Sequence, residues 1–274
     1  MRLRPFSADL HIHSALSPCA EDHMRPNEVL RRIISLGIDV FSITDHNSGF
    51  NSAVFGEAVG GREILFIPGI ELQSAEEIHL LGYFPDNRAL SSFCKAVVRP
   101  GLVQGVKNDP QRFGNQFKLN TEGDVTGEVE EMLSMPLSVP IDTLVDQIHH
   151  FNGIAVAAHL DKGFSVISHL GYIPAELRLD AVEIMDVEKI EIIRSKYLRE
   201  RSLNIVSSSD AHHLDMMRPA STKLWLETGD VKSCIDCIKG AGPGRITISQ
   251  KVRRKGLSEA HRSKRDWKAL YEQS

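Results

Sequence analysis

The sequence has little net charge and no long apolar run. Its 274 residues carry a formal net charge of −4, which argues against a protein that coats nucleic acid by bulk electrostatics but leaves room for a local basic patch. The first residues, MRLRPFSADLHIH, contain no apolar run long enough for a signal peptide. No later apolar run reaches the length of a membrane span. We therefore expect a cytoplasmic protein without a membrane partner.

Cysteine is also scarce. Cys19, Cys94, Cys234 and Cys237 are too few and too irregularly spaced for the disulfide framework of a secreted protein, so we expect reduced thiols. The pair Cys234-x-x-Cys237 lies in VKSCIDCIKG, a predicted amphipathic helix, and lacks the second Cys or His pair of a structural zinc site. A structural role is predicted for this pair.

Short apolar, β-branched segments alternate with amphipathic helical stretches, a pattern typical of parallel strands joined by crossover helices. One such helix is predicted to begin at Pro26 and to stop at Gly37. The predicted strands are Ser7 to His11, Val40 to Thr44, Ile64 to Ile70, Ile78 to Phe84, Ile154 to Ala158, Ala181 to Met185, Ile205 to Ser209 and Lys223 to Leu226. The pattern favours a barrel-like α/β fold.

Two regions depart from this alternation. Residues 86 to about 140 are rich in Gly, Asn, Asp and Pro and are predicted to be a partly helical insertion that could cover the active site. Residues 251–274 hold eight Lys or Arg against three acidic residues. We therefore expect one barrel domain over residues 1–250 and a basic C-terminal tail.

Histidine and carboxylate residues follow nearly every predicted strand, where barrel enzymes build their active sites. Strand residues alternate between faces, so His11 and His13 point the same way and can bind one ion. Mixed imidazole and carboxylate ligands fit a hydrolytic cluster of divalent metal ions, which lowers the pKa of water and provides hydroxide for phosphoryl displacement. The residues concerned are His11, His13, Asp45, His46, Glu71, His79, His159, Asp210 and His212.

Each piece alone has an ordinary explanation. Paired histidines are common on surfaces, Asp45 after a strand could cap the next helix, and a single Glu71 or His79 is more often solvated or hydrogen-bonded than a ligand. The joint occurrence of all these residues at equivalent strand ends would need several unrelated explanations. A metal cluster is the better hypothesis.

The segments ADLHIHS, ITDHNS, GIE with EIHLLGYF, AAHLD and SSDAH resemble, in order and context, the motifs of the polymerase and histidinol phosphatase (PHP) family of metal-dependent phosphoesterases. The resemblance covers roughly residues 7–85 and 140–228, and FGNQ in the insertion resembles a segment of uncharacterised bacterial members. It implies a distorted TIM-like barrel of about seven βα units that binds two or three divalent ions, with zinc, manganese or iron as the candidates.

The resemblance also implies the ligand sets. His11, His13, Glu71 and Asp210 would hold a first ion, Glu71 with His79 and His159 a second, and His46 with His212 part of a third. Glu71, His159 and Asp210 are the residues on which catalysis would depend.

The third set departs from the family pattern, because the expected Asp or His is missing after His13. Cys19 stands where some relatives have histidine, and its thiolate could replace that ligand, although a small buried residue is an equally good interpretation. Glu21 or Asp22 could also reach back into the site.

Three basic residues near these motifs, Arg25, Lys162 and Arg218, could bind a substrate phosphate, and Lys162 is the first choice because it follows His159. His169 could act as a general acid, but a structural hydrogen bond is the preferred interpretation. For His149 and His150 we predict a capping role at the end of a helix.

The leading hypothesis is metal-dependent hydrolysis of a phosphorylated small molecule or nucleotide. One alternative is a nuclease that acts on nucleic-acid ends, guided by the basic tail. Another is a catalytically silent metal-binding regulatory domain, because a fold can persist without its chemistry.

Overall fold

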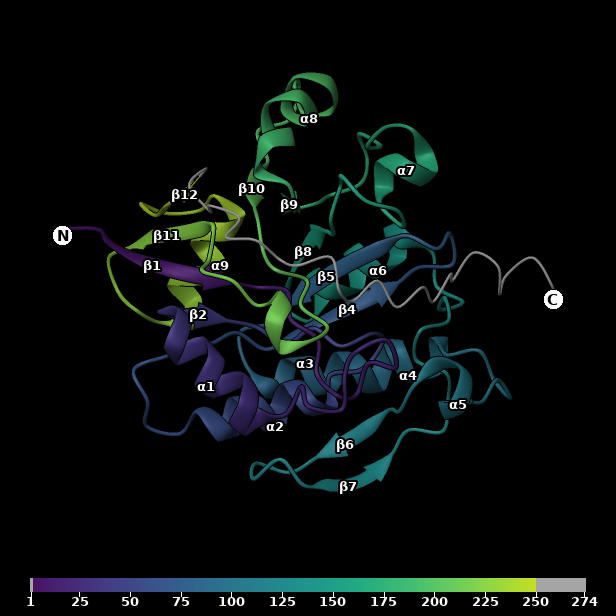
Figure 1. Cartoon of the computed structure of the whole chain (residues 1–274). Helices are drawn as coiled ribbons and strands as arrows, with labels where there is room; N and C mark the ends of the chain where they lie inside the picture. Colours follow the sequence, from purple (N-terminus) through teal and green to yellow (C-terminus); the bar gives the residue numbers. More distant parts are fainter. Residues whose placement is uncertain (1, 250–274) are drawn as a thin grey trace.

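The computed structural model describes residues 2–249, and the predicted basic tail lies outside the described residues. Two five-stranded sheets and the helices around them form a mixed α/β fold (Figure 1). The first sheet has the order β12-β11-β1-β2-β3. Its strands are β1 (Arg4–Asp9), β2 (Val40–Phe41), β3 (Leu65–Phe66), β11 (Thr222–Leu226) and β12 (Arg245–Ile248).

The second sheet has the order β10-β9-β8-β5-β4. Its strands are β4 (Gly69–Gln73), β5 (His79–Tyr83), β8 (Ile154–Ala157), β9 (Ala181–Glu183) and β10 (Asn204–Val206). Two isolated parallel bridges join the sheets. One pairs Ile12 with Ala211, which follow β1 and β10, and the other pairs His46, which follows β2, with Glu71 of β4. Residues from distant parts of the sequence therefore meet at this junction.

The predicted mixed α/β class is confirmed, and each of the eight predicted segments overlaps a strand. The pairing differs in detail from a regular barrel of seven βα units. β5 runs antiparallel to both β4 and β8. Only a short turn separates Gln73 from His79, and a parallel connection needs a crossover of about a dozen residues or more. Between β3 and β4, Pro68 has no N–H to donate, and the predicted single strand is split there.

The helices pack their apolar faces on the sheets. α1 (Pro26–Leu36) begins with Pro26 and is capped by Gly37, whose φ of 64° is the left-handed conformation that glycine adopts without strain, as predicted. The other α-helices of at least five residues among residues 2–249 are α2 (Phe50–Val59), α3 (Asn87–Phe93), α6 (Ile141–His150), α7 (Val166–Leu170), α8 (Ile190–Tyr197) and α9 (Val231–Lys239). No helix among residues 2–249 is both long enough and apolar enough to cross a membrane.

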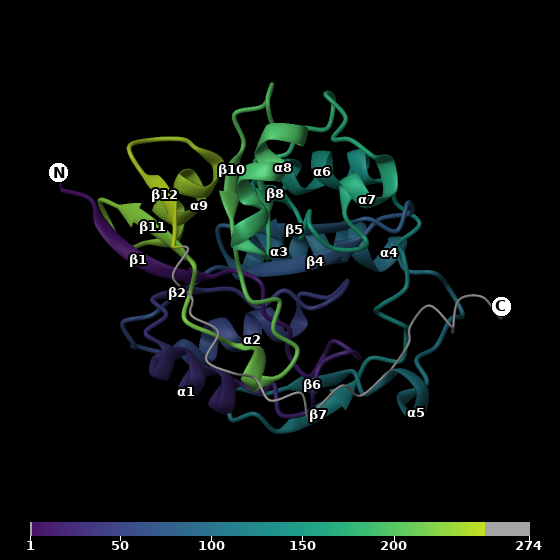
Figure 2. The same ribbon diagram turned by 45° about the horizontal axis from the view of Figure 1, so that its top comes forward.

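The insertion is partly helical, as predicted, and also contains a hairpin that the sequence did not indicate. It comprises α3, a π-helical turn (Cys94–Val98), α4 (Arg99–Gly101), α5 (Pro110–Phe113) and the antiparallel pair β6 (Phe117–Leu119) and β7 (Val125–Glu128). Both views place the hairpin on the side of α1 and α2, away from α8, and β6 contacts α2 (Figures 1 and 2).

The four cysteines are free thiols, as expected. Cys234 and Cys237 are buried on α9, in the amphipathic helix that the sequence predicted. Burial raises the pKa of these thiols to about 12 and about 11. Both side chains pack in the core with strands of the first sheet, which agrees with a structural role.

Candidate metal centre

The first group of candidate ligands lies at the junction of the two sheets. His11 and His13 flank the bridged residue Ile12, and their Nε2 atoms are 3.2 Å apart. Oδ1 of Asp210 lies 3.3 Å from both Nε2 atoms. The carboxylate of Glu71 completes the group, with one oxygen 3.4 Å from His11 Nε2 and the other 3.4 Å from His13 Nε2.

These distances can be compared with those around a bound ion. A tetrahedral ion with donors at about 2.0–2.1 Å separates those donors by roughly 3.3–3.4 Å. The donor pairs named above are 3.2–3.4 Å apart, and all four side chains are buried. The group thus has both the spacing and the chemistry of a metal site.

A second group surrounds the same carboxylate. Oε1 of Glu71 lies 3.0 Å from Nδ1 of His79 and 3.4 Å from Nε2 of His159. The two histidine nitrogens are 3.2 Å from each other. These three residues come from β4, β5 and the turn after β8, which are neighbours in the second sheet.

A third group consists of His13, His46 and His212, whose ring nitrogens gather within ligand distance of one another. Burial would raise the pKa of the nearby Cys19 thiol, but the charges and hydrogen bonds of His212 and His46 outweigh it and lower the pKa to about 6. Glu21 is exposed, and both carboxylate oxygens of Asp22 accept hydrogen bonds from Asn115. Cys19 is therefore better placed than either acid to complete this group, and its role as a ligand stays a prediction.

Glu71 links the three groups. Its Oε1 contacts the first and second groups, and its Oε2 lies 3.0 Å from Nδ1 of His46 in the third. Burial would raise the pKa of the Glu71 carboxyl, but the charges of His79, His11 and His46 hold it well below its usual range. At His79, burial dominates and lowers the pKa to about 4, so this imidazole is neutral and keeps a free lone pair.

Some buried polar atoms at the centre have no well-directed hydrogen bond within residues 2–249. They include Nδ1 of His46 and Oε2 of Glu71, which lie 3.0 Å from each other, Nδ1 of His159 and Oε1 of Glu183. Polar atoms buried in this way normally have a partner, because an unsatisfied one costs about 1–3 kcal/mol. Burial opposes protonation of His11, yet Glu183, Asp210 and Glu71 raise its pKa well above the ordinary value. The cluster attracts positive charge, and divalent ions would fit it.

Two of the candidate ligands stand on strained backbone. His159 has a φ of 26° and Asp210 a φ of 49°, in the left-handed region that non-glycine residues rarely adopt. Glu183, the last residue of β9, stabilises the strained turn at His159 through two hydrogen bonds. A carboxylate oxygen of Glu183 accepts the His159 N–H at 3.1 Å, and its carbonyl accepts the N–H of Leu160 at 2.8 Å.

Glu183 is a residue that the sequence reasoning missed. Its carboxylate is fully buried, and Oε2 lies 2.9 Å from Nδ1 of His11 as well as close to the His159 amide. Metal-ligating histidines usually donate their second nitrogen to such a carboxylate, which fixes the ring and its tautomer. The sequence feature that could have indicated Glu183 is its acidic side chain inside an otherwise apolar predicted strand, Ala181 to Met185.

A second network supports the loop after His13. The Asp45 carboxylate accepts hydrogen bonds from the amide and hydroxyl of Ser14 and from the hydroxyl of Ser17. The Ser17 hydroxyl also lies 3.0 Å from Nδ1 of His13. Asp45 therefore orients the neighbours of a candidate ligand rather than capping a helix.

The insertion packs against this same loop. The Phe117 amide donates to the Ala15 carbonyl at 2.8 Å. Gly114 has a φ of 102°, and a Cβ there would lie 2.1 Å from the Pro18 carbonyl oxygen, so only glycine fits. The FGNQ segment thus fixes the insertion beside the third group.

The three basic residues predicted to bind phosphate are placed differently. Lys162 Nζ lies 3.0 Å from Asp210 Oδ2, at the cluster, and its side chain is 43% exposed. The guanidinium of Arg25 donates to the carbonyls of Asp22 and Gly123, and that of Arg218 to those of Met185 and Ser208. Lys162 is accordingly the one of the three placed at the candidate ligands.

Two of the three other histidines considered from the sequence make side-chain hydrogen bonds. His149 lies in the last turn of α6, but its Nε2 contacts Asp180 at 2.7 Å instead of the helix carbonyls that we expected. His169 is exposed on α7, and its Nδ1 lies 3.1 Å from the Ser168 hydroxyl, in line with the preferred structural interpretation.

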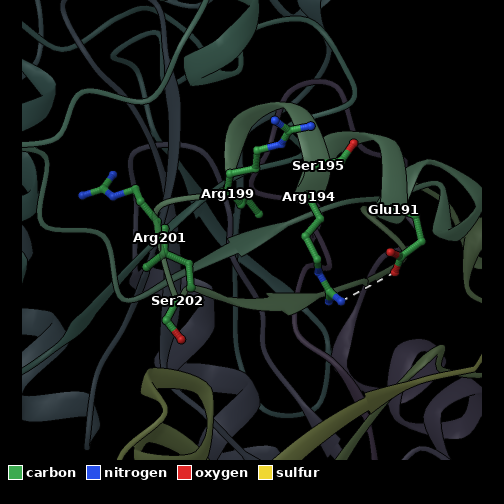
Figure 3. Close-up of a pocket in the computed structure, with 8 residues that line it drawn as sticks. Glu191, Arg194, Ser195, Arg199, Arg201 and Ser202 are labelled. Carbon is green, nitrogen blue, oxygen red and sulfur yellow. Dashed lines mark ion pairs between the residues drawn. The ribbon is translucent and has the colours of Figure 1, made fainter.

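A hollow of about 520 Å³ lies elsewhere, beside α8. Its wall includes Arg194, Arg199 and Arg201, whose side chains point apart in Figure 3. Arg194 is paired with Glu191 at 3.5 Å, and the Arg201 guanidinium is held by three backbone carbonyls. This hollow contains none of the residues of the histidine and carboxylate cluster.

Solved structures resemble the chain in fold. The lesion-specific endonuclease PfuEndoQ from Pyrococcus furiosus aligns over 89% of this chain and 58% of its own, with 15% identity and a TM-score of 0.61. Endonuclease Q with a 27-mer duplex bearing an abasic lesion gives 15% identity, 88% and 58% coverage and a TM-score of 0.62. The present chain therefore spans less than two thirds of these endonuclease chains.

A further structure with this fold is a two-domain protein from Bacteroides vulgatus that contains a predicted PHP-like metal-dependent phosphoesterase. It shares 13% identity over 90% of this chain and 66% of its own, with a TM-score of 0.51. Likenesses at such low identity describe the fold alone. Among curated protein sequences, none matches the chain.

The family match and the candidate ligand cluster together support a metal-dependent hydrolase as the class of this protein. The PHP domain model matches residues 9–198, and the chain belongs to the PHP family. The resemblance seen in the sequence motifs is thereby confirmed.

Proposed function

We propose that the protein hydrolyses phosphate esters, either phosphorylated small molecules or nucleotides, at the cluster around Glu71. The observation that carries this proposal is the position of one buried carboxylate between the histidine groups, with Oε1 3.0 Å from His79 and Oε2 3.0 Å from His46. A carboxylate so placed can bridge two ions, and paired ions are typical of phosphoester hydrolysis.

Each group has its own part in this proposal. His11, His13, Glu71 and Asp210 would hold one ion, Glu71, His79 and His159 a second, and His46, His212 and Cys19 a third. Zinc, manganese and iron suit these ligands. Bound ions would lower the pKa of water and neutralise charge on the phosphate oxygens. Lys162, which already faces Asp210 at 3.0 Å, would bind a substrate phosphate oxygen.

We also propose an architecture for the domain that holds the cluster. The bridges from Ile12 to Ala211 and from His46 to Glu71 connect the two sheets at the cluster. We propose that they complete a distorted barrel of seven βα units in one domain over residues 1–250, with residues 86–140 inserted.

A nuclease that acts on nucleic-acid ends is a second candidate function. The fold likeness to an endonuclease supports a nuclease in general but not a preference for strand ends, and this chain spans only 58% of that protein. A catalytically silent regulatory domain is a third candidate. It is disfavoured because a silent domain has no need to keep a carboxylate such as that of Glu71 in a bridging position between histidine groups.

The test is a panel of phosphorylated metabolites, nucleotides and short oligonucleotides, assayed separately with manganese, zinc and iron. We expect turnover of at least one phosphate monoester that depends on added metal. Cleavage confined to oligonucleotides would favour the nuclease, and no turnover by fully metal-loaded protein would favour the silent domain.

A further inference from the structure

One loop between β8 and α7 brings an aromatic ring to the metal centre. Phe164 is 39% exposed, a large fraction for a phenylalanine, and its φ of 56° lies in the left-handed region. A bulky residue in that region is an outlier, and such strain is kept where the surrounding structure requires the position. Because Phe164 lies beside the candidate ligand His79, we looked for a functional reason for its strained conformation.

The ring of Phe164 is the middle member of a stack. It lies nearly parallel to His79, with ring centroids 5.2 Å apart and 14° between the planes. On the outer side, the exposed His169 ring lies 5.9 Å away at 27°. The stack leads from a candidate ligand of the second group to the protein surface.

The backbone under this stack is fixed. The carbonyl of Phe164 accepts the N–H of His79 at 2.7 Å, which ties the loop to the start of β5. The next residue, Ser165, is fully buried and forms a capping box with Ser168 at the start of α7. The exposed aromatic ring is thus held in place before any ligand arrives, which reduces the entropic cost of binding.

The same loop carries charge for a phosphate. Lys162, two residues before Phe164, reaches Asp210 at the cluster. A cation at the metal centre and a rigid aromatic stack beside it fit the two halves of a nucleoside phosphate, one anionic and one planar. Alkyl and sugar phosphates offer no planar ring to the stack.

We propose that Phe164 is a specificity-determining residue whose exposed ring edge, between His79 and His169, packs against the base of a nucleoside phosphate. This inference rests on the proposed function, and it names the substrate class. An edge-to-face contact between aromatic rings typically strengthens binding about two- to tenfold. The base could belong to a free nucleotide or to the end of a strand.

The test compares Phe164→Leu and Phe164→Tyr with the wild type, all loaded with manganese. Calorimetry measures binding of an adenosine phosphonate, whose ester oxygen is replaced by carbon, and of propylphosphonate. We expect Phe164→Leu to weaken the binding of adenosine phosphonate about two- to tenfold. Phe164→Tyr should stay within about twofold of the wild type, and propylphosphonate should bind all three proteins alike. A phosphorylated hexanucleotide tests a strand end as the source of the base.

The control variant is Phe50→Leu, because Phe50 is also exposed, at 46%, but lies at the start of α2. It should bind both phosphonates as the wild type does. Equal weakening of both phosphonates, or loss of bound manganese in Phe164→Leu, would overturn the inference and leave Phe164 as a mere support for His79. Binding is measured without turnover, so failure of the hydrolysis assay would count against the proposed function alone.

Discussion

Glu183 and His11 form a buried carboxylate–imidazole pair at the metal centre, with 2.9 Å between Oε2 and Nδ1. The same oxygen accepts the amide of His159 at 3.1 Å. One side chain therefore orients residues of the first and second groups. This contact fixes His11 with its Nε2 directed at Glu71 and Asp210.

Substitution of Glu183 should weaken metal binding more than it disturbs the fold. We expect a loss of zinc affinity of about tenfold for Glu183→Gln, which keeps the shape, and about hundredfold for Glu183→Ala. Competition with a chromophoric chelator measures the affinity, and circular dichroism checks the fold. Glu130→Gln, at an exposed pair with Lys107, is the control. Unchanged zinc affinity in folded Glu183→Ala would show that the pair has no positioning role.

The thiol of Cys19 should be unusually reactive in metal-free protein. Its pKa of about 6 makes the thiolate the main form at pH 7, whereas burial raises the pKa of Cys94 to about 12. We expect iodoacetamide to modify Cys19 much faster than Cys94, with a rate that falls as the pH drops through 6. Zinc should protect Cys19. Mass spectrometry of the peptides measures both sites, and equal rates would rule out the thiolate.

Removal of Lys162 should impair substrate binding without loss of metal. For Lys162→Ala we expect KM for the best phosphate ester to rise about tenfold or more, because a charged hydrogen bond is lost. Lys189→Ala is a matched control, since Lys189 is half exposed and 3.9 Å from Asp161 rather than at the cluster. A normal KM in Lys162→Ala would exclude the lysine from phosphate recognition.

Asp180 should link stability to pH. Burial would raise its pKa, but hydrogen bonds from His149 and the Ala155 amide lower it below the ordinary value. An acid with a depressed folded-state pKa stabilises the protein above its unfolded pKa, and this contribution disappears as the pH falls through the folded pKa.

We therefore expect Asp180→Asn to lower the free energy of unfolding by about 1–3 kcal/mol at pH 7. The difference from the wild type should shrink as the pH falls below about 4, the unfolded value. Urea unfolding at several pH values measures it. A difference that stays constant from pH 7 to strongly acidic conditions would contradict the assigned role of the carboxylate.

The sequence located most strands because β-branched residues such as Ile205 and Val206 mark buried strands locally. It also indicated the candidate ligands, most of which follow strands, although Glu71 lies within β4 and His79 begins β5. Their role as ligands stays a prediction. It could not show that β5 runs antiparallel to both neighbours, because strand direction depends on tertiary pairing. The weakly apolar hairpin β6–β7 was missed for a related reason. β6 is partly buried and β7 is mostly exposed, and both strands are too short to show a clear alternating pattern.

Glu183 was missed because its partner His11 lies 172 residues away. No local pattern reports such a contact. The loop after His13 shows the same limit, since the sequence left Cys19, Glu21 and Asp22 as equivalent candidates. Only the fold reveals that Asn115 of the insertion binds the Asp22 carboxylate.

The central claim is that Glu71 joins neighbouring metal ions. Its most direct test is the number of metal equivalents per chain, measured by mass spectrometry of digested protein for the wild type, Glu71→Ala and His159→Ala. We predict more than one equivalent in the wild type, a loss of bound metal in both variants that is larger for Glu71→Ala, and a parallel loss of hydrolysis with an unchanged circular dichroism spectrum. Full metal content and full activity in folded Glu71→Ala would contradict the assignment.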